Sequence, residues 1–197
     1  YGSGPHPDPS TSFGSGYYTK NDFIEILKYA AERHIEVIPE LDFPGHARAA
    51  IVAMKARQKR LIAEGEKAKA NEYILHDPND ASRYRSIQLY DDNVICVCQP
   101  STYRFLEKLT DEVINMYDAA GLKLKQVHIG GDEVPHPTTD DPGHGAWKGS
   151  PKCNAFLEAD DDYKNSEELF YYFVDRFSKI LEDRDIVTAG WEEISLV

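Results

Sequence analysis

The chain has 197 residues, of which 41% are hydrophobic and 28% are charged. Its 22 Lys and Arg residues against 34 Asp and Glu residues give a net charge of −12. This charge argues against nucleic acid or an anionic membrane as the partner, because phosphates would be repelled. The apolar content is too high for a disordered protein, the length suits one domain, and no apolar run reaches the roughly 18 residues of a membrane span.

The first residues indicate that the chain is an excerpt from a longer protein. Residue 1 is Tyr and not Met, and no basic stretch followed by an apolar one marks a signal peptide. Residues 2–16 are rich in Gly, Ser and Pro, which predicts a loop.

Hydrophobic periodicity along the chain predicts helices that alternate with short strands. Apolar side chains recur at helical spacing in four segments, and three shorter apolar runs end in Pro, Gly or acidic residues. Residues 64–85 and 134–164 are polar or rich in turn-forming residues and are predicted to be loops. The predicted elements are a helix capped by Thr19, a strand over 35–41, a helix over 47–63, a helix over 102–120, a strand over 124–129, a helix begun by a capping box of Asn165 and Glu168, and a strand over 186–191.

This order predicts the fold class. Strands that alternate with helices form a parallel α/β sheet, and each predicted strand here ends in residues that can do chemistry. An α/β barrel places its active site at the carboxyl ends of its strands, but eight strands need about 250 residues. We therefore expect residues 1–197 to be one partial (β/α)8 TIM-barrel domain with long loops after its strands.

The most informative motif is His-Ile-Gly-Gly-Asp-Glu at residues 128–133, at the end of the second predicted strand. The two glycines let the backbone approach a ligand closely and turn out of the strand. Asp132 and Glu133 are consecutive carboxylates, and repulsion between like charges raises one pKa, as a general acid requires. Two alternatives stay open: Asp132 caps a helix while Glu133 is solvated, or both ligate a metal.

Two other strand ends add candidate residues. Asp-Phe-Pro-Gly-His at residues 42–46 ends in His46, which either orients a catalytic carboxylate or is a structural hydrogen-bonding residue. Trp191 follows the third strand, where an indole either stacks on a sugar or fills the core. A metal-dependent enzyme would need a third acidic ligand, for which only Glu192 or Glu193 is placed.

An acid, a second carboxylate, an imidazole and an aromatic ring together suit the hydrolysis of sugars. Most glycosidases use two carboxyl groups on either side of the scissile bond, about 5 to 9.5 Å apart. Asp132 and Glu133 are poorly placed for that, because neighbouring residues point in different directions. A mechanism fits better in which the enzyme supplies one acid and the substrate supplies the nucleophile.

These motifs resemble glycoside hydrolase family 20, the β-N-acetylhexosaminidases, and within it the bacterial chitobiases. The resemblance covers nearly the whole chain in order. It rests on Tyr-Tyr-Thr-Lys at residues 17–20, Ile-Pro-Glu-Leu-Asp-Phe-Pro-Gly-His at 38–46, His-Ile-Gly-Gly-Asp-Glu at 128–133, and Ala-Gly-Trp-Glu-Glu at 189–193.

The resemblance implies a substrate-assisted retaining mechanism through an oxazolinium intermediate, without metal or cofactor. Glu133 matches the general acid, and Asp132 matches the carboxylate that holds the acetamido N–H. His46 matches an imidazole near the acid, and Trp191 matches one wall of the acetamido pocket. The resemblance also places Asp42 and His128 behind the catalytic pair and Glu192 beside the substrate.

The implied substrate is a terminal, non-reducing β-linked N-acetylhexosamine, GlcNAc or GalNAc, of chitooligosaccharides or glycoconjugates. Other segments of the same barrel would supply the arginine and the further aromatic residues of the site. A second hypothesis is a non-catalytic carbohydrate-binding fragment of such a barrel.

The three cysteines are too few for a disulfide scaffold and lack the spacing of a zinc site, so buried thiols are one interpretation. The resemblance implies instead that Cys98 pairs with Cys153 and that Cys96 stays free. It also implies an exported protein, whether periplasmic, associated with the outer membrane or secreted, which is compatible with a disulfide.

Overall fold

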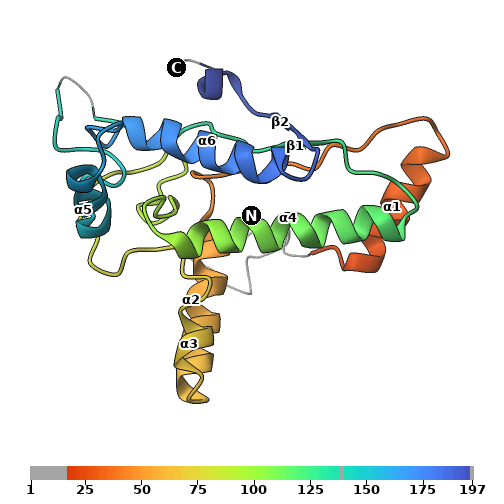
Figure 1. Cartoon of the computed structure of the whole chain (residues 1–197), viewed down its shortest axis with the longest axis horizontal. Coiled ribbons are helices and arrows are strands. Elements are labelled where there is room, and N and C mark those ends of the chain that lie inside the picture. The colour runs from red at the N-terminus through yellow and green to blue at the C-terminus, as the bar shows by residue number, and fades with distance from the viewer. Residues whose placement is uncertain (1–16, 138–139, 196–197) are drawn as a thin grey trace.

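The computed structural model of the protein describes residues 17–137 and 140–195, so the predicted loop over residues 2–16 lies outside it. The helices α4 and α6 lie side by side, α1 packs on α4, and α2 with α3 projects away from them (Figure 1). Within the described ranges, no helix is long and apolar enough to cross a membrane. In chain order the elements are α1 (Lys20–Ala31), α2 (Arg48–Ala63), α3 (Lys67–Ala70), α4 (Pro100–Ala119), β1 (Gln126–His128), α5 (Pro151–Ala159), α6 (Glu168–Glu182), β2 (Val187–Ala189) and the short 3-10 helix η1 (Glu192–Ser195).

Helix α1 begins where its capping residues predict. The Thr19 side chain accepts the Asp22 backbone N–H, and the Asp22 carboxylate accepts the Thr19 N–H at 2.8 Å. Both otherwise unpaired donors at this end of the helix are thereby satisfied. Lys20 forms an ion pair with Glu112, and Phe23 packs edge-to-face on Tyr117, which joins α1 to α4.

Helix α6 supplies much of the core, as its apolar stripe predicts. Phe173, Phe177 and Leu181 are fully buried, and the helix packs against α4 on one side and β2 on the other. Burial of each such side chain contributes about 1.5–3 kcal/mol to stability. The predicted capping box is wrong in one half: the Asn165 side chain accepts the Glu168 N–H, but the Glu168 carboxylate accepts the Lys164 N–H and not that of Asn165.

The sheet is parallel, which confirms the predicted α/β class at this level. β1 pairs with β2 in the register Gln126 with Val187 and His128 with Ala189. The connection between them contains α5 and α6, as a parallel pair requires a long crossover. The carboxyl ends of the two strands therefore lie at the same edge of the sheet.

The strand predicted over residues 35–41 is present only as a single bridge between Glu40 and His128. Around this bridge, Leu41 N–H donates to the His128 carbonyl at 2.7 Å, so residues 39–43 still run parallel to β1. The ladder does not continue upstream, because Pro39 has no N–H and the Val37 carbonyl accepts the Tyr117 hydroxyl at 2.7 Å.

Two short helices lie in segments that were expected to be loops. α3 follows the turn at Gly65 and buries Ala70. α5 lies inside residues 134–164, where the Ser150 side chain caps it through the Cys153 N–H and Pro151 occupies its first turn. The capping signal of α5 is local, and neither helix shows in the hydrophobic periodicity because both are short.

A disulfide fixes α5 to the segment before α4. It joins Cys98 to Cys153, the pair that the resemblance implies, and Cys96 is a free buried thiol. Trp147 lies in the same region, and its indole N–H donates to the Ile95 carbonyl at 2.7 Å. Trp147 is therefore a core residue of the long loop.

Candidate active site

The candidate site lies at the carboxyl ends of residues 39–43, β1 and β2. Asp42 ends the first of these segments, Asp132 and Glu133 follow β1, and Trp191 follows β2. Since the three segments are parallel and adjacent, their ends bring residues from three parts of the chain to one place.

The two glycines after β1 make this convergence possible. Gly130 has φ +73°, and a Cβ atom built on it would lie 2.0 Å from Asp42 Oδ1. Gly131 has φ +95°, and a Cβ there would lie 2.3 Å from the Ile194 side chain. Only glycine combines these backbone angles with such close contacts, so the glycine pair allows the carboxylate of Asp42 to pack against the turn.

His46 joins the two consecutive carboxylates. Its Nε2 lies 3.4 Å from Asp132 Oδ2 and 3.2 Å from Glu133 Oε2. His46 and Glu133 also have left-handed backbone angles, φ +44° and +51°, which cost on the order of 1–3 kcal/mol each and occur preferentially at functional sites. His46 thus lies close to both carboxylates, and its two interpretations stay predictions.

Asp42 lies behind this pair and has the most altered acidity of the site. Burial, followed by the negative charge of Asp132, raises the pKa of Asp42 from 3.8 to about 7. A hydrogen bond with Asp132 favours the same protonated form. Repulsion between like charges was expected within the pair Asp132 and Glu133, whereas in the structure it acts on Asp42.

Two buried oxygens of the site have no hydrogen-bond partner among the described residues. They are Oδ1 of Asp42 and Oδ1 of Asp132. A buried oxygen without a donor is costly in a folded protein. Asp42, His46 and Asp132 each also offer one possible metal-ligand atom. These three atoms lie within 4.8 Å of one another, a spacing that could accommodate a metal ion.

Trp191 forms an exposed wall beside the carboxylates. Among the described residues its side chain is 49% exposed. Its indole N–H donates to Glu40 Oε1 at 3.0 Å, and its ring packs edge-to-face on His128 with centroids 4.9 Å apart. His128 Nδ1 lies 3.4 Å from the same Glu40 oxygen. His128 therefore supports Trp191, and the orientation of the indole is fixed on two sides.

Sequence reasoning missed two residues of the site, and the role of a third, Glu192, stays a prediction. Glu40 holds Trp191, and Gln88 donates from its side-chain amide to Glu133 Oε2 at 2.8 Å. Glu40 lay within a quoted motif but carried no signal of its own, and Gln88 lies in a polar loop 45 residues before Glu133. Glu192 begins η1 directly after Trp191, and among the described residues no side-chain hydrogen bond or ion pair joins it to the carboxylates.

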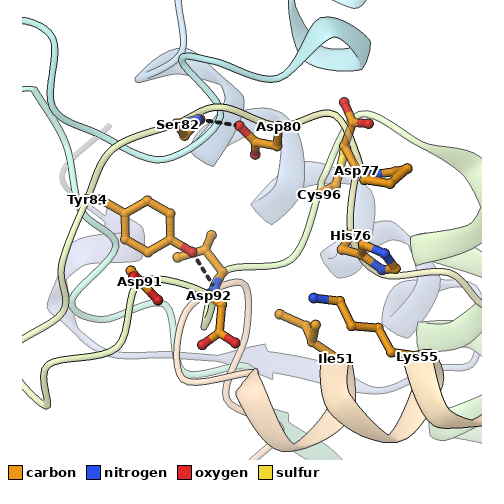
Figure 2. A pocket seen from close by; sticks show the side chains of 12 residues that line it. Ile51, Lys55, His76, Asp77, Asp80, Ser82, Tyr84, Asp91, Asp92 and Cys96 are labelled. Carbon is orange, nitrogen blue, oxygen red and sulfur yellow. Dashed lines mark hydrogen bonds between the residues drawn. The ribbon is translucent and has the colours of Figure 1, made fainter. Parts of the chain in front are cut away.

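A separate pocket contains none of these residues. It lies between α2 and the segment before α4, and Figure 2 shows Lys55 and His76 beside Asp77, with Asp91 and Asp92 near Tyr84. Burial, followed by the charge of Lys55, lowers the pKa of His76. The Tyr84 hydroxyl accepts the Val94 N–H at 3.2 Å, which holds two parts of this wall together.

An α/β architecture with a carboxylate cluster at its strand ends is typical of enzymes that carry their chemistry at the edge of a parallel sheet. The model of the catalytic domain of glycosyl hydrolase family 20 matches residues 3–196. The chain belongs to this family.

Known proteins with similar sequences and structures agree with this assignment. The chain is 41% identical over 181 residues to a β-hexosaminidase of Vibrio vulnificus, covering 91% of this chain and 20% of that protein. It is 40% identical over 214 residues to the N,N'-diacetylchitobiase of Vibrio harveyi, covering 98% of this chain and 24% of that protein.

Among solved structures, the exo-β-N-acetylglucosaminidase of Vibrio harveyi in complex with N-acetylglucosamine superposes with a TM-score of 0.71 at 33% identity, covering 93% of this chain and 24% of that one. An inactive mutant of that enzyme, with alanine in place of an aspartate, gives a TM-score of 0.70 at 32% identity and the same coverage. The chain thus spans about a fifth to a quarter of the length of these relatives.

Proposed function

We propose that the protein carrying this chain hydrolyses terminal, non-reducing β-linked N-acetylhexosamine from chitooligosaccharides or glycoconjugates. The substrate's own acetamido oxygen is the nucleophile, and the reaction retains the anomeric configuration through an oxazolinium intermediate. The family assignment supports this proposal, as does the binding of N-acetylglucosamine by the structurally similar enzyme of Vibrio harveyi.

The observation that carries the mechanism is that Asp132 and Glu133 both approach one nitrogen of His46, at 3.4 and 3.2 Å. Two carboxylates that approach one imidazole atom lie on the same side of the site, so the expectation that these neighbouring residues point in different directions was wrong. A mechanism with an enzymic nucleophile needs carboxyl groups on either side of the scissile bond. The arrangement of the pair instead suits one carboxylate for proton transfer and the other for holding the acetamido group of the same substrate.

In the proposed roles, Glu133 donates a proton to the leaving glycosidic oxygen and later accepts one from the attacking water. Asp132 accepts the acetamido N–H and so aligns the acetamido carbonyl with the anomeric carbon. Trp191 forms the wall against which the acetamido group packs, and Asp42, His46 and His128 hold these groups in place.

We further propose that residues 1–197 are part of a closed (β/α)8 barrel, and that other segments of that barrel complete the site. Exposed apolar side chains support this proposal, because Ile35 and Ile38 precede the first parallel segment and Val187 lies in β2. The chain covers only about a fifth to a quarter of the length of its relatives, which also supports a barrel completed by other segments. Export of the protein is proposed on the family resemblance and is compatible with the Cys98–Cys153 disulfide.

The proposed function is tested by comparing an aryl β-N-acetylglucosaminide with the matching β-glucoside, using the full-length protein. We expect turnover of the acetamido sugar and almost none of the glucoside. Equal rates would show that the nucleophile is an enzymic group outside this pair. Binding of the sugar without turnover of either compound would identify a carbohydrate-binding module, and loss of turnover with a chelator would identify a metal enzyme.

Glu133→Gln tests the role of the acid in the same protein. Glutamine has nearly the same size but cannot donate the carboxylic proton, so we expect kcat to fall by about 10²- to 10⁴-fold while N-acetylglucosamine still binds. Glu25→Gln, which changes an exposed glutamate of α1, is the matched control, and we expect it to leave kcat within about threefold of the wild type. Turnover by Glu133→Gln at nearly the wild-type rate would show that another group is the acid.

A further inference from the structure

The Glu133 carboxylate has one oxygen that is engaged and one that is free. Gln88 Nε2 donates to Oε2 at 2.8 Å, and His46 Nε2 lies 3.2 Å from the same atom. Among the described residues, Oε1 has no hydrogen-bond partner, and the Glu133 side chain is about one-third exposed at 33%. The two oxygens are thus chemically distinct before any substrate binds.

The position of Gln88 is set by the turn that carries it. Leu89 N–H donates to the Ser86 carbonyl at 2.9 Å, and Ser86 N–H donates to the Tyr90 carbonyl at 2.8 Å. Leu89 takes the left-handed angle φ +69°, which tightens the turn at the residue after Gln88. Backbone hydrogen bonds on both sides of Gln88 therefore fix the position of its main chain, from which the side chain extends toward Glu133.

The turn is also fixed to the segment that carries His46. The Arg48 guanidinium lies 5.0 Å from the centre of the Tyr90 ring, and its Nε donates to Asp92 Oδ1 at 2.7 Å. Arg48 comes two residues after His46 at the start of α2. The two groups that face Glu133 Oε2, the Gln88 amide and the His46 imidazole, are consequently held by one connected unit.

We propose that Gln88 is a positioning residue that selects which oxygen of Glu133 exchanges the proton. An oxygen that accepts an amide N–H serves as the carbonyl oxygen of a carboxylic acid, so the proton of the acid form resides on Oε1. Oε1 is also the oxygen that is free to reach a substrate. This inference rests on the proposed function and adds to it the residue that orients its acid.

The proton then follows a defined path. In the first step the O–H bond at Oε1 breaks, the proton passes to the glycosidic oxygen, the bond from that oxygen to the anomeric carbon breaks, and the acetamido oxygen bonds to the same carbon. The negative charge left on Glu133 is stabilised at Oε2 by the N–H of Gln88. In the second step a water oxygen bonds to the anomeric carbon, the bond between that carbon and the acetamido oxygen breaks, and one proton of the water returns to Oε1. Gln88 itself gains and loses no proton.

The test exploits the dependence of acid catalysis on the leaving group. A dinitrophenol leaves without protonation, whereas an unsubstituted phenol needs the proton in the transition state. For Gln88→Met, of similar size but without a donor, we expect kcat on the phenyl β-N-acetylglucosaminide to fall by about 10- to 100-fold, and kcat on the dinitrophenyl compound by less than about threefold.

Two comparisons keep this test specific. Ile87→Ala changes an adjacent, 77% exposed side chain of the same turn and should leave the ratio of the two rates unchanged. Adding Gln88→Met to the Glu133→Gln variant should cause little further loss, because residues that act as a unit are not additive. Thermal unfolding of each variant shows whether the turn still folds.

The outcomes separate this inference from the proposed function. Equal losses on both substrates, or no loss on either, would show that Gln88 does not orient the acid. A loss confined to KM for oligosaccharides would make Gln88 a contact of the leaving sugar instead. If the wild-type protein fails to hydrolyse either acetamido compound, the proposed function itself is wrong.

Discussion

The raised pKa of Asp42 makes the stability of the folded protein depend on pH near neutrality. Its carboxyl group is partly buried beside Asp132, and its pKa rises from 3.8 to about 7. The folded protein therefore binds a proton at Asp42 that the unfolded chain releases between about pH 4 and 7. Stability from this group is present below the unfolded pKa and is lost as the pH rises through the folded value.

Asp42→Asn tests this linkage, because asparagine has the same shape and cannot ionise. We expect the free energy of unfolding of the wild type to fall between pH 5 and about pH 8 more steeply than that of the variant, with a difference on the order of 1–2 kcal/mol. Denaturant titrations of both full-length proteins at several pH values measure it. Parallel pH profiles would show that Asp42 ionises normally in the folded protein.

At the level of the elements, the turn after β1 determines whether the site can assemble. Gly130 and Gly121 have nearly the same backbone angle, φ +73° and +75°. A Cβ at Gly130 would lie 2.0 Å from Asp42 Oδ1, whereas one at Gly121 would have nothing within 4 Å. The two positions therefore separate backbone strain from the steric demand of the site.

Gly121→Ala should cost about 1–2 kcal/mol of stability, from the left-handed angle alone, and leave turnover intact. Gly130→Ala adds a collision with Asp42 to the same strain, so we expect a loss of about 2–4 kcal/mol together with most of the turnover. Chemical denaturation and kcat of the two full-length variants provide the comparison. Equal effects would show that Asp42 can move away from the turn at little cost.

At the level of the whole molecule, the Cys98–Cys153 disulfide closes a loop that includes α4, β1 and the start of α5. The two cysteines are 55 residues apart in sequence. A cross-link over such a loop stabilises a protein mainly by restricting its unfolded chain, typically by about 2–4 kcal/mol. The loop contains Asp132 and Glu133, so the disulfide also limits how far the segment that carries them can depart from the core.

We expect the Cys98→Ser, Cys153→Ser double variant to lose about 2–4 kcal/mol of stability. Reductant should lower the melting temperature of the wild type but leave that of the double variant unchanged. Cys96→Ala, which removes the buried free thiol, is the matched control and should keep the sensitivity to reductant. A wild type that is insensitive to reductant would contradict a structural role for this disulfide.

The outcome for individual segments shows which features could be predicted. The cap at Thr19, the apolar stripe of α6 and the parallel class follow from local patterns, and the structure confirms them. The strand over residues 35–41 was overestimated, since an apolar run does not show that the Val37 carbonyl pairs with the Tyr117 hydroxyl of α4. α3 and α5 were missed because they are too short to show helical periodicity.

The order of residues along the chain was enough to identify the carboxylate pair, the glycines that precede it, and the imidazole and indole that accompany it, because strand ends and glycine turns are encoded locally. It could not show that Gln88 reaches Glu133, that Glu40 holds Trp191, or that the charge of Asp132 acts on Asp42. Each of these depends on a distance between segments far apart in sequence. Such distances are set by the packing of helices and strands on one another, and that packing exists only in the folded molecule.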